Sequence, residues 1–485
     1  MEGSEPGEKK STLGVPKETG EGERRVALVP DAVMKYVSAG LAVLIETGAG
    51  EQSFFSDAAY ANAGATIAPN ARDVLSQADI VLKVQSPTTD EINQMKSGAS
   101  LVAFLSPMTS PDLVNQLRDH SLTSFSMDAI PRTTRAQTMD ALSSMATVSG
   151  YKAVLLAADH LAKFFPLLMT AAGTIPPAKV LVIGAGVAGL QAIATARRLG
   201  AVVEAYDTRP VVKEQVESLG AKFVEIDTGV TDTQDAGGYA KEATADVIRR
   251  QQEVLAERAS RADAVVTTAA VPGRPAPRLI SEETVKNMAN GSVIVDLAAE
   301  TGGNCELTVR GETVVRHGVT IIGTVNLPSA IPVHASQMYS KNIQNLLALM
   351  IDKNGAYAVN LDDDIVRGTI ITHEGEILHE GTKARMQPPE AVPATPPTDE
   401  STATAATAAS VDQSVDIDDA LAQPIAADED GSQVASVEES LAESSPIAMP
   451  ESSNGADLSD VSESAIANDS ESIGREGISG SEGDA

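Results

Sequence analysis

The sequence has 485 residues, enough for two or three domains with cores of their own, and a formal net charge of −31. This acidic balance disfavours nucleic acid as a partner, because neutralising phosphates requires clustered Lys and Arg. The single cysteine, Cys305, excludes an intrachain disulfide framework and thiolate metal clusters, which is typical of a reducing cytoplasm. The six His residues show no ligand spacing, so we expect no metal site.

The last 102 residues differ in composition from the rest of the chain. Residues 384–485 hold 22 Asp and Glu against two Arg, which accounts for −20 of the net charge. They include no aromatic residue and are rich in Ala, Ser and Pro, so they cannot bury enough apolar surface to offset the entropy of ordering them. We therefore predict a disordered acidic tail over 384–485.

No stretch of the sequence suggests insertion into a membrane. Residues 1–10 are polar and lack the apolar core of a signal peptide, so we predict a flexible N-terminus there. The most apolar stretch, Ala153–Gly173, is interrupted by Asp159, His160 and Lys163. We therefore expect no segment that spans a bilayer.

From residue 11 onward, short apolar runs alternate with helical patterns, an order typical of βαβ units and a mainly parallel sheet. A first series contains the strand-like runs STLGVP, LAVLIE, DIVLKV and SLVAFL, with helices expected near Asp31–Ser38 and Asp57–Ala63. A second series begins at Lys179. It contains KVLVIG, VVEAYD, KFVEI, AVVTTAA, SVIVDLA and VTIIGT, with helices expected near Val187–Leu199, Val211–Leu219 and Tyr239–Ala259.

Two long helices are expected outside these series, at Met139–Phe165, where Pro166 ends the helix, and at Val333–Ile351. If the second helix returns the chain to the first domain, the hairpin-like GTIITHEGEILH completes that domain. We therefore predict two doubly wound, Rossmann-like α/β domains. The N-terminal domain is discontinuous, over 11–142 and 330–383, and the second domain covers 143–329.

The run KVLVIGAGVAGLQAIATARRLGAVVEAYD carries a GxGxxG pattern after an apolar strand and at the start of a helix. Gly184 permits a tight turn, Gly186 lets the backbone approach a pyrophosphate, and Gly189 lets helix and strand pack closely. The helix N-terminus adds amide donors and a favourable dipole. The alternative is that the glycines serve only the turn, but the context favours a Rossmann domain that binds a dinucleotide over 143–329.

The next strand ends at Asp207, eighteen residues after Gly189. A carboxylate there accepts hydrogen bonds from both hydroxyls of the adenosine ribose and repels a 2′-phosphate, which favours NAD over NADP. Arg209, two residues later, is instead a residue that could bind a 2′-phosphate. Because Asp207 is present, we predict NAD(H) as the cofactor.

A second polar stretch, PRTTRAQTMDALSS (131–144), crowds charged and amide side chains into the approach to a predicted long helix. It could be an ordinary capping segment, or it could hold a ligand, and the stretch alone does not separate these. A nicotinamide enzyme that reduces a free substrate generally needs a proton donor such as His, Lys or Tyr. None of the six His residues has a recognisable partner for that role.

Seven longer motifs extend over most of the chain. They are GVPKETGEGERRVALVPDAV (14–33), DIVLKVQSP (79–87), PRTTRAQTMDALSS (131–144), MTAAGTIPPAKVLVIGAGVAGLQAIATARRLGA (169–201), DAGGYAKE (235–242), IVDLAAETGGNC (294–305) and NLPSAIPVHAS (326–336). Over 11–381 the chain resembles the NAD(H)-binding component, domain I or the first part of the alpha subunit, of proton-translocating NAD(P) transhydrogenase. It resembles alanine dehydrogenase, which shares the two-domain fold, more distantly.

The resemblance implies that 131–144 forms a loop over the nicotinamide, in an NAD cleft between the two domains, and that a mobile loop with Gly237, Gly238 and Tyr239 folds over the nucleotide. The residues implied in catalysis orient the carboxamide and ribose ends of NADH: Gln137, Arg132, Asp140, Ser143 and Tyr239. The residues implied in cofactor binding are Arg132, Thr133, Thr134, Gln137, Gly184, Gly186, Val187, Ala188, Gly189, Asp207, Thr208, Arg209, Gly238, Gln251, with Gln252 as its neighbouring alternative, and Ala270.

The resemblance further implies direct hydride transfer from NADH to NADP(H) bound by a partner subunit, coupled to proton translocation through membrane-spanning transhydrogenase subunits. With one nucleotide fingerprint and no expected span, the chain is similar to the split form in which domain I is its own subunit. The implied assembly is a homodimer in the cytoplasm, attached peripherally to the inner (plasma) membrane through its partners. The acidic extension after Gly381 departs from the family's short linker.

Two other functions stay open. In alanine dehydrogenase the substrate carboxylate is held at positions matched by Arg25 and Lys83, although Lys83 could equally be a structural lysine at a strand end. Ser106 in VAFLSPM takes the place of that enzyme's acid/base histidine, which argues against deamination. The other alternative is a non-enzymatic NAD sensor whose acidic tail binds a regulatory partner.

Overall fold

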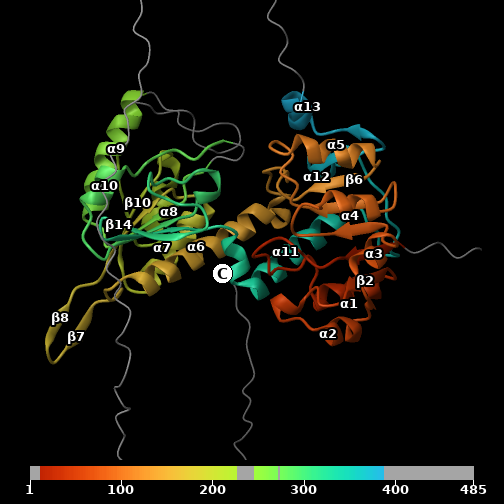
Figure 1. The fold of residues 1–485 in the computed structure, drawn as a ribbon, viewed down its shortest axis with the longest axis horizontal. Helices are drawn as coiled ribbons and strands as arrows, with labels where there is room; N and C mark the ends of the chain where they lie inside the picture. The colour runs from red at the N-terminus through yellow and green to blue at the C-terminus, as the bar shows by residue number, and fades with distance from the viewer. Residues whose placement is uncertain (1–10, 227–244, 271–273, 387–485) are drawn as a thin grey trace, which may run out of the picture. The chain divides into compact units, whose positions relative to one another are not determined.

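The structure, a computed structural model, describes residues 11–226, 245–270 and 274–386, with only the backbone described at 245–247. All of them belong to one compact unit, Met1–Thr395. They form two mainly parallel β-sheets flanked by helices and a separate two-stranded hairpin (Figure 1). The predicted α/β class with parallel sheets is confirmed.

The first sheet has eight strands, six of them parallel. In sheet order they are β17 (Glu376–Ile377), β16 (Ile370–His373), β6 (Thr123–Ser126), β5 (Ser100–Ala103), β4 (Ile80–Leu82), β1 (Thr12–Val15), β2 (Ala42–Glu46) and β3 (Thr66–Ala68). The strands β1 to β6 pair in parallel, while β16 pairs antiparallel with β6 and with β17. A segment near residue 370 thus completes a sheet that began near residue 12.

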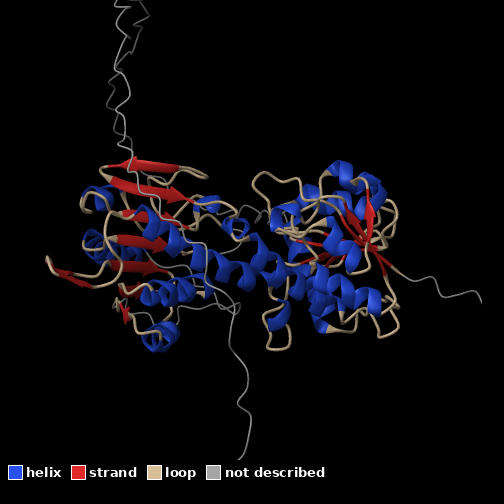
Figure 2. Cartoon of the chain, turned by 90° about the horizontal axis from the view of Figure 1, so that it is seen from below, coloured by secondary structure: helices blue, strands red, loops and turns tan. Residues whose placement is uncertain are grey.

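Helices cover both faces of this sheet (Figure 2). Those from its N-terminal part are α1 (Pro30–Ser38), η1 (Glu51–Ser53), α2 (Asp57–Asn62), α3 (Ala71–Leu75), α4 (Thr89–Gln94) and α5 (Pro111–Asp119). One core combines side chains of α1, α2 and α11 (Pro332–Leu347), and the other those of α3, α4 and α5. The short helices η5 (Leu327–Ala330), α12 (Asp364–Thr369) and α13 (Glu380–Met386) complete this part.

The second sheet has seven strands in the order of a Rossmann fold. They are β11 (Lys222–Phe223), β10 (Val202–Tyr206), β9 (Lys179–Ile183), β12 (Ala264–Thr267), β13 (Val293–Asp296), β15 (Val319–Gly323) and the antiparallel β14 (Thr313–Arg316). Numbered from β9, the parallel strands follow the order 3-2-1-4-5-6, with the topological switch point between β9 and β12. The central strands β9, β12 and β13 are almost wholly buried apolar runs, as expected for a sheet covered on both faces.

The helices of the second sheet also lie on two faces. One core contains α6 (Ala141–His160) and α7 (Val187–Arg198), and the other contains α9 (Ala245–Ser260) and α10 (Glu282–Lys286). The remaining short elements are η2 (Gln137–Met139), η3 (Pro210–Val212), α8 (Lys213–Ser218), η4 (Ala299–Thr301) and the hairpin β7 (Leu168–Thr170) and β8 (Gly173–Ile175).

The long helix expected to run to Phe165 is shorter in the structure, because α6 ends at His160. Tertiary contacts hold the following residues in a non-helical path. Lys163 pairs with Asp263 at 2.5 Å, and Phe165 is buried. The prediction was therefore wrong at this end, since Pro166 marks only the last residue at which the helix could have stopped.

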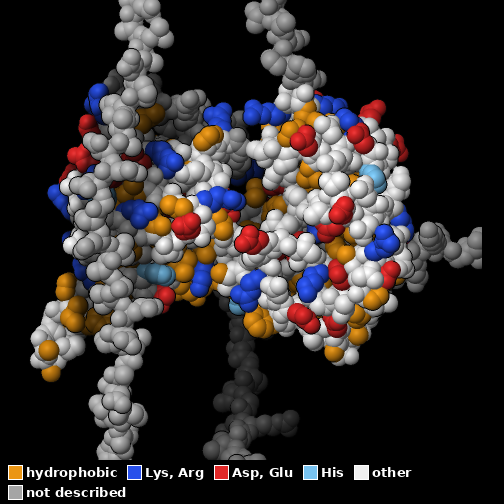
Figure 3. Space-filling view, in the orientation of Figure 1, with side chains coloured by type: hydrophobic (Ala, Val, Ile, Leu, Met, Phe, Trp, Pro, Cys, Tyr) orange, Lys and Arg blue, Asp and Glu red, His pale blue; other side chains and the backbone are white. Residues whose placement is uncertain are grey.

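Among the described residues, one helix, Ala141–His160, is long and apolar enough to cross a membrane by length and composition alone. Such a helix is weak evidence for a span, because core helices pass the same test, and α6 contributes Ala153, Val154 and Ala157 to a core of the second sheet. On the face in Figure 3, acidic and basic side chains of the described residues are interspersed.

Some predictions concern residues outside those described. They include the flexible N-terminus, the loop with Gly237, Gly238 and Tyr239, and the acidic tail from 387 onward. The helix α13 continues to Met386, three residues beyond Lys383, after which the tail was expected to begin. The bounds of the two domains stay a prediction.

Candidate nucleotide-binding site

The turn after β9 needs glycine at two positions for reasons of packing. Gly184 has a φ of +96°, and a Cβ there would lie 2.5 Å from Thr268 Oγ1. A Cβ on Gly189 would lie 1.8 Å from the carbonyl oxygen of Gly184, so only glycine lets α7 approach the turn this closely. Thr268 donates its hydroxyl to the same carbonyl at 3.0 Å. These contacts explain Gly184 and Gly189 without a ligand.

Gly186 has no such internal reason. A Cβ there would meet nothing closer than Arg209 Nη2, at 3.9 Å. Gly186 is the N-cap of α7, and the next residue, Val187, is 42% exposed. The first amides of a helix have no acceptor within the helix and lie at the positive end of its dipole. The backbone from Gly186 through Ala188 thus suits close approach of an anion such as a pyrophosphate, at the switch point of the sheet.

The carboxylate of Asp207, directly after β10, accepts four hydrogen bonds. Two come from backbone N–H groups, of Ala185 at 2.7 Å and of Arg209 at 2.9 Å. The other two come from the Arg209 guanidinium, through Nε and Nη2 at 2.8 Å each. Thr208 lies between them in the sequence. The two side chains that raised opposite expectations about the ribose are therefore bonded to each other.

Two further residues of the predicted nucleotide site lie on the second sheet's elements, Ala270 shortly after β12 and Gln251 on α9. Ala270 is exposed, and the preceding Ala269 is fixed by the buried side chain of Asn304, which accepts from its N–H at 3.0 Å and donates to its carbonyl at 2.7 Å. Gln251 is buried, whereas Gln252 is exposed and donates to a backbone carbonyl. Asn304 was missed from the sequence, because its role depends on a contact 35 residues away.

The predicted loop 131–144 presents several of its polar side chains to solvent. Arg132, Thr133, Thr134 and Gln137 are all exposed. Asp140 instead caps α6, accepting from the backbone N–H of Ser143 at 2.9 Å and from its hydroxyl at 2.5 Å. The capping interpretation therefore holds for Asp140 and Ser143 in this structure, while the side chain of Gln137 is exposed to solvent.

The loop is held by residues that the sequence did not indicate. Arg135 forms a bidentate ion pair with Asp363 at 2.8 Å and also contacts Asp364. The carbonyl of Thr138 accepts from two amides of α11, those of Asn342 and Asn345, at 2.9 Å each. These anchors lie more than 200 residues from the loop in sequence, so no local pattern could have revealed them.

Helix α6 connects the loop with the glycine turn. Asp140 caps its N-terminus, and Gly150 lies in its middle, where a Cβ would be only 2.1 Å from the carbonyl oxygen of Ala188. The missing side chain at Gly150 therefore lets α6 and α7 cross in close contact. About ten residues of helix separate the two points, which corresponds to about 15 Å along the axis.

The two cations matched to a substrate site in alanine dehydrogenase are both paired with carboxylates of this chain. Arg25 donates to Glu23 through Nε at 2.8 Å and Nη2 at 2.6 Å. Lys83 lies 2.7 Å from Glu91 and 3.4 Å from Glu18. Burial opposes the charge of Lys83, but the two carboxylates outweigh it and raise the pKa of Lys83.

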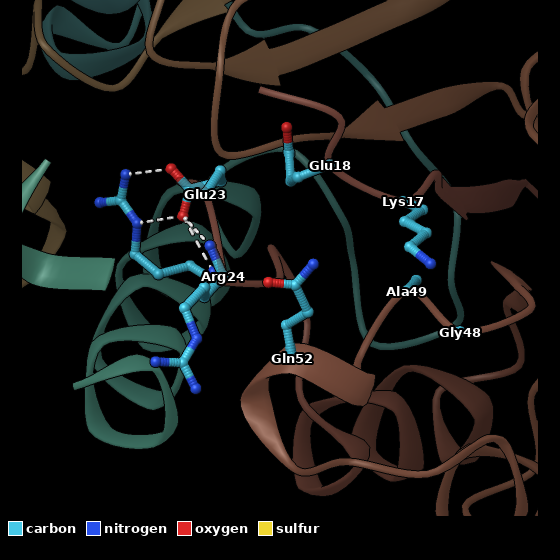
Figure 4. A pocket seen from close by; sticks show the side chains of 8 residues that line it. Lys17, Glu18, Glu23, Arg24, Gly48, Ala49 and Gln52 are labelled. Carbon is cyan, nitrogen blue, oxygen red and sulfur yellow. Dashed lines mark hydrogen bonds and ion pairs between the residues drawn. The ribbon is translucent and has the colours of Figure 1, made fainter. Parts of the chain in front are cut away.

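Glu23 is the centre of a buried polar network. It also accepts from Ser329 Oγ at 2.6 Å, Gln85 Nε2 at 2.6 Å and Asn326 Nδ2 at 3.1 Å. Burial acts to raise the pKa of Glu23, but the hydrogen bonds and the charge of Arg25 outweigh it and leave the pKa at about 2. A small polar pocket adjoins this network (Figure 4), lined by Lys17, Glu18, Glu23, Arg24, Arg25, Gly48, Ala49 and Gln52.

Ser106, at the place of the dehydrogenase histidine, lies after β5 with a φ of +47° and an exposed side chain. Its carbonyl accepts from the N–H groups of Thr109 and Ser110 in the turn that follows. Among the residues that the structure describes, no group of three or more His, Cys, Asp or Glu side chains could hold a metal ion.

Comparisons with known proteins agree with this geometry. The N-terminal domain model described as alanine dehydrogenase/PNT matches residues 14–149, and the C-terminal domain model of the same description matches 153–380. The first part of the NAD(P) transhydrogenase alpha subunit of Rhodospirillum rubrum is 48% identical over 374 residues, 76% of this chain and 97% of the relative. Alanine dehydrogenase of Bacillus subtilis is 31% identical over 392 residues, 79% of this chain and 96% of the relative.

The solved structures that resemble this chain include the same two kinds of protein. A transhydrogenase from Sinorhizobium meliloti superposes with a TM-score of 0.69 at 43% identity, covering 76% of this chain and all of that one. An L-alanine dehydrogenase superposes with a TM-score of 0.63 at 28% identity, covering 77% of this chain and 98% of that one. Both the sequence and the fold agree, so the chain belongs to the alanine dehydrogenase/PNT family.

Proposed function

We propose that the chain is the NAD(H)-binding subunit of a proton-translocating NAD(P) transhydrogenase, which exchanges hydride directly with NADP(H) on a partner subunit. Helix α6 is the observation that carries this proposal. It bears the polar loop at its N-terminus and packs against the glycine turn at Gly150. A nucleotide anchored at the turn and a loop that orients its ring are therefore held at a fixed spacing, on which hydride transfer between two rings depends steeply.

The roles of the residues follow from their chemistry. A bound nicotinamide supplies the hydride chemistry itself, so the protein provides binding and orientation. The amides from Gly186 to Gly189 would hold the pyrophosphate, and Asp207 the adenosine ribose. The exposed Gln137 and Arg132 would orient the carboxamide, with Asp140 and Ser143 near the ribose beside it. Tyr239 and Gly238 would close over the nucleotide, but they lie outside the described residues.

The partners follow from the reaction. Hydride must be received by NADP(H) on an NADP-binding domain, and proton translocation requires membrane-spanning subunits, so we place the chain in the cytoplasm, attached peripherally to the inner membrane. Its relative from Haemophilus influenzae is named NAD(P) transhydrogenase subunit alpha, and this chain covers 71% of it at 48% identity. We further propose that the subunit is a homodimer, and gel filtration with light scattering tests this directly.

Alanine dehydrogenase is the alternative that the family and the positions of Arg25 and Lys83 support. Alanine oxidation must remove protons from an amine and from an attacking water, whereas hydride exchange between nicotinamides needs no general acid. A serine hydroxyl such as that of Ser106 does not carry protons near neutral pH as a histidine does. This difference favours transhydrogenation.

One experiment separates the functions. The purified chain is mixed with NADH, an NADP analogue and an NADP-binding partner domain, and hydride exchange is followed by absorbance. We expect exchange only when both proteins are present, and no pyruvate from alanine and NAD with this chain alone. Alanine oxidation at ordinary dehydrogenase rates, about 1–10³ per second, would contradict the proposal. Binding of NADH without any exchange would instead support an NAD sensor.

A further inference from the structure

The pairing of Asp207 with Arg209 bears on how this chain distinguishes two dinucleotides. Both side chains are largely removed from solvent, with 7% of Asp207 and 18% of Arg209 exposed. An ionised carboxylate offers about four acceptor positions, and the four donors of Ala185 and Arg209 fill them. The carboxylate therefore has no acceptor position to spare for a ribose while Arg209 is bound to it.

The four donors are not equivalent. Two are backbone N–H groups fixed by the turn, whereas Nε and Nη2 of Arg209 belong to a side chain with rotatable bonds. A ribose with two neighbouring hydroxyls also presents two adjacent donors, so it can take the same two acceptor positions. Binding of NADH then requires an exchange in which the diol replaces the guanidinium.

The guanidinium stays charged when it is displaced, and its position in the structure is close to the glycine turn. Its Nη2 lies 3.9 Å from where a Cβ of Gly186 would be, beside the turn proposed to hold the pyrophosphate. A 2′-phosphate on the ribose would replace one hydroxyl of the diol next to Asp207, within the range of this side chain. Arginine is well suited to bind a phosphate through two parallel hydrogen bonds. An ionised carboxylate such as that of Asp207, in contrast, repels the phosphate.

We propose that Asp207 and Arg209 form a coupled specificity pair, in which Asp207 selects NADH and, by engaging Arg209, suppresses a latent site for the 2′-phosphate of NADPH. The proposal rests on the proposed function, since it assumes that the glycine turn binds a dinucleotide. The proposal gives Arg209 a role in nucleotide specificity that depends on its pairing with Asp207.

The test compares the wild-type chain with Asp207→Asn, Arg209→Gln and the double variant, using calorimetry with NADH and NADPH on the full chain. Binding of NADH by the wild type checks the proposed function separately. Asp207→Asn is expected to weaken NADH and to strengthen NADPH, each by about tenfold or more, the effect of one or two charge-assisted hydrogen bonds. The gain in NADPH affinity should be lost in the double variant.

A matched control is Arg261→Gln, which removes an exposed arginine that directly follows α9 and pairs with Glu257, and this change should leave the gain intact. If Asp207→Asn plus Arg209→Gln binds NADPH as tightly as Asp207→Asn, the proposal is overturned. Should Asp207→Asn fail to fold, Arg209→Gln alone decides. It should leave the affinity for NADPH within about threefold of wild type and should not weaken NADH, because it removes the group that competes with the ribose diol for Asp207. A tenfold fall in NADPH affinity would mean that Arg209 already binds the 2′-phosphate, and it would overturn the proposal.

Discussion

Gly186 and Gly189 stand three residues apart in one motif, yet the structure gives them different physical roles. At Gly189 the space for a side chain is filled by the carbonyl of Gly184, so the requirement for glycine is internal to the fold. At Gly186 the space is not filled by the protein. The backbone conformation there is extended, which any residue can adopt, so its glycine points to a ligand.

This difference predicts a separation of stability from binding. Gly189→Ala should destabilise the fold by about 1–3 kcal/mol or more, because a Cβ forces α7 away from the turn. Gly186→Ala should cost less than about 1 kcal/mol but weaken NADH by about tenfold or more, because its methyl group obstructs the pyrophosphate. Thermal unfolding and calorimetry measure the two effects. Equal NADH affinity in Gly186→Ala and wild type would refute the ligand role of this glycine.

Glu23 illustrates a buried charge that is stabilised by its partners. Its side chain is 1% exposed, and its hydrogen bonds join the N-terminal segment to Gln85 and to Asn326 and Ser329. Its pKa falls from 4.5 to about 2 on folding. A depressed pKa means that the stabilisation is fully present above pH 4.5 and is lost as the pH falls towards 2.

Glu23→Gln should therefore lower the free energy of unfolding by about 3 kcal/mol at pH 7, the equivalent of a shift of between two and three pKa units. The difference from wild type should shrink as the pH falls below 4.5. Urea unfolding at several pH values between 3 and 7 measures it, with the exposed Glu21→Gln as control. A difference that stays constant across this range would contradict the role of the Glu23 charge.

At the scale of elements, the polar loop is positioned by helices that come late in the sequence. Arg135 reaches Asp363 at the N-cap of α12, and Thr138 is held by two amides of α11. A Cβ on Gly368 would lie 2.5 Å from Pro131 Cγ, so α12 also packs tightly against the start of the loop. The loop is thus fixed at three points, while Gln137 stays exposed.

Loss of the ion pair between Arg135 and Asp363 should disturb the orientation of the nicotinamide more than the binding of NADH. Arg135→Ala is expected to slow hydride exchange several-fold while NADH affinity stays within about threefold of wild type, the pattern for an interaction needed only at the reacting geometry. Arg135→Lys should restore part of the rate, because lysine keeps the charge but not the bidentate fork. Arg118→Ala, which breaks an exposed pair with Asp119 on α5, is the control. Equal rates in the Arg135 and Arg118 variants would rule out the anchor.

At the scale of the whole molecule, the chain leaves the first sheet after β6, forms the second sheet, and returns through α11 to add β16 beside β6. The final helix, α13, places Met386 against the core formed by α3, α4 and α5. The chain beyond Met386 has a composition that does not favour a core of its own.

Truncation should therefore be tolerated after Met386 but not earlier. A chain ending at Met386 should keep its NADH affinity and a melting temperature within about 2 °C of the full chain. A chain ending at Thr382 loses the last turn of α13 and should melt at a lower temperature. Calorimetric melting of the three chains checks this. A large loss on removing only 387–485 would show that the acidic tail packs against the rest.

The features that could be predicted from the sequence depend on neighbours in the chain. Buried strands are continuous apolar runs, and a GxGxxG pattern after such a run at the start of a helix indicates a nucleotide turn. The position of Asp207 at the end of the next strand follows from the same unit. For this reason the α/β class, the two parallel sheets and the residues of the turn were accessible before the structure.

Other features depend on which distant segments meet. The end of α6 at His160 reflects the pairing of Lys163 with Asp263, 100 residues away, and the loop anchors span more than 200 residues. Arg209 stands close to Asp207 in sequence, yet only the turn between β9 and α7 brings the N–H of Ala185 to the same carboxylate and completes its four hydrogen bonds. A local pattern determines which backbone conformation a segment favours, whereas the order of strands and the crossing of helices decide which charged groups become partners.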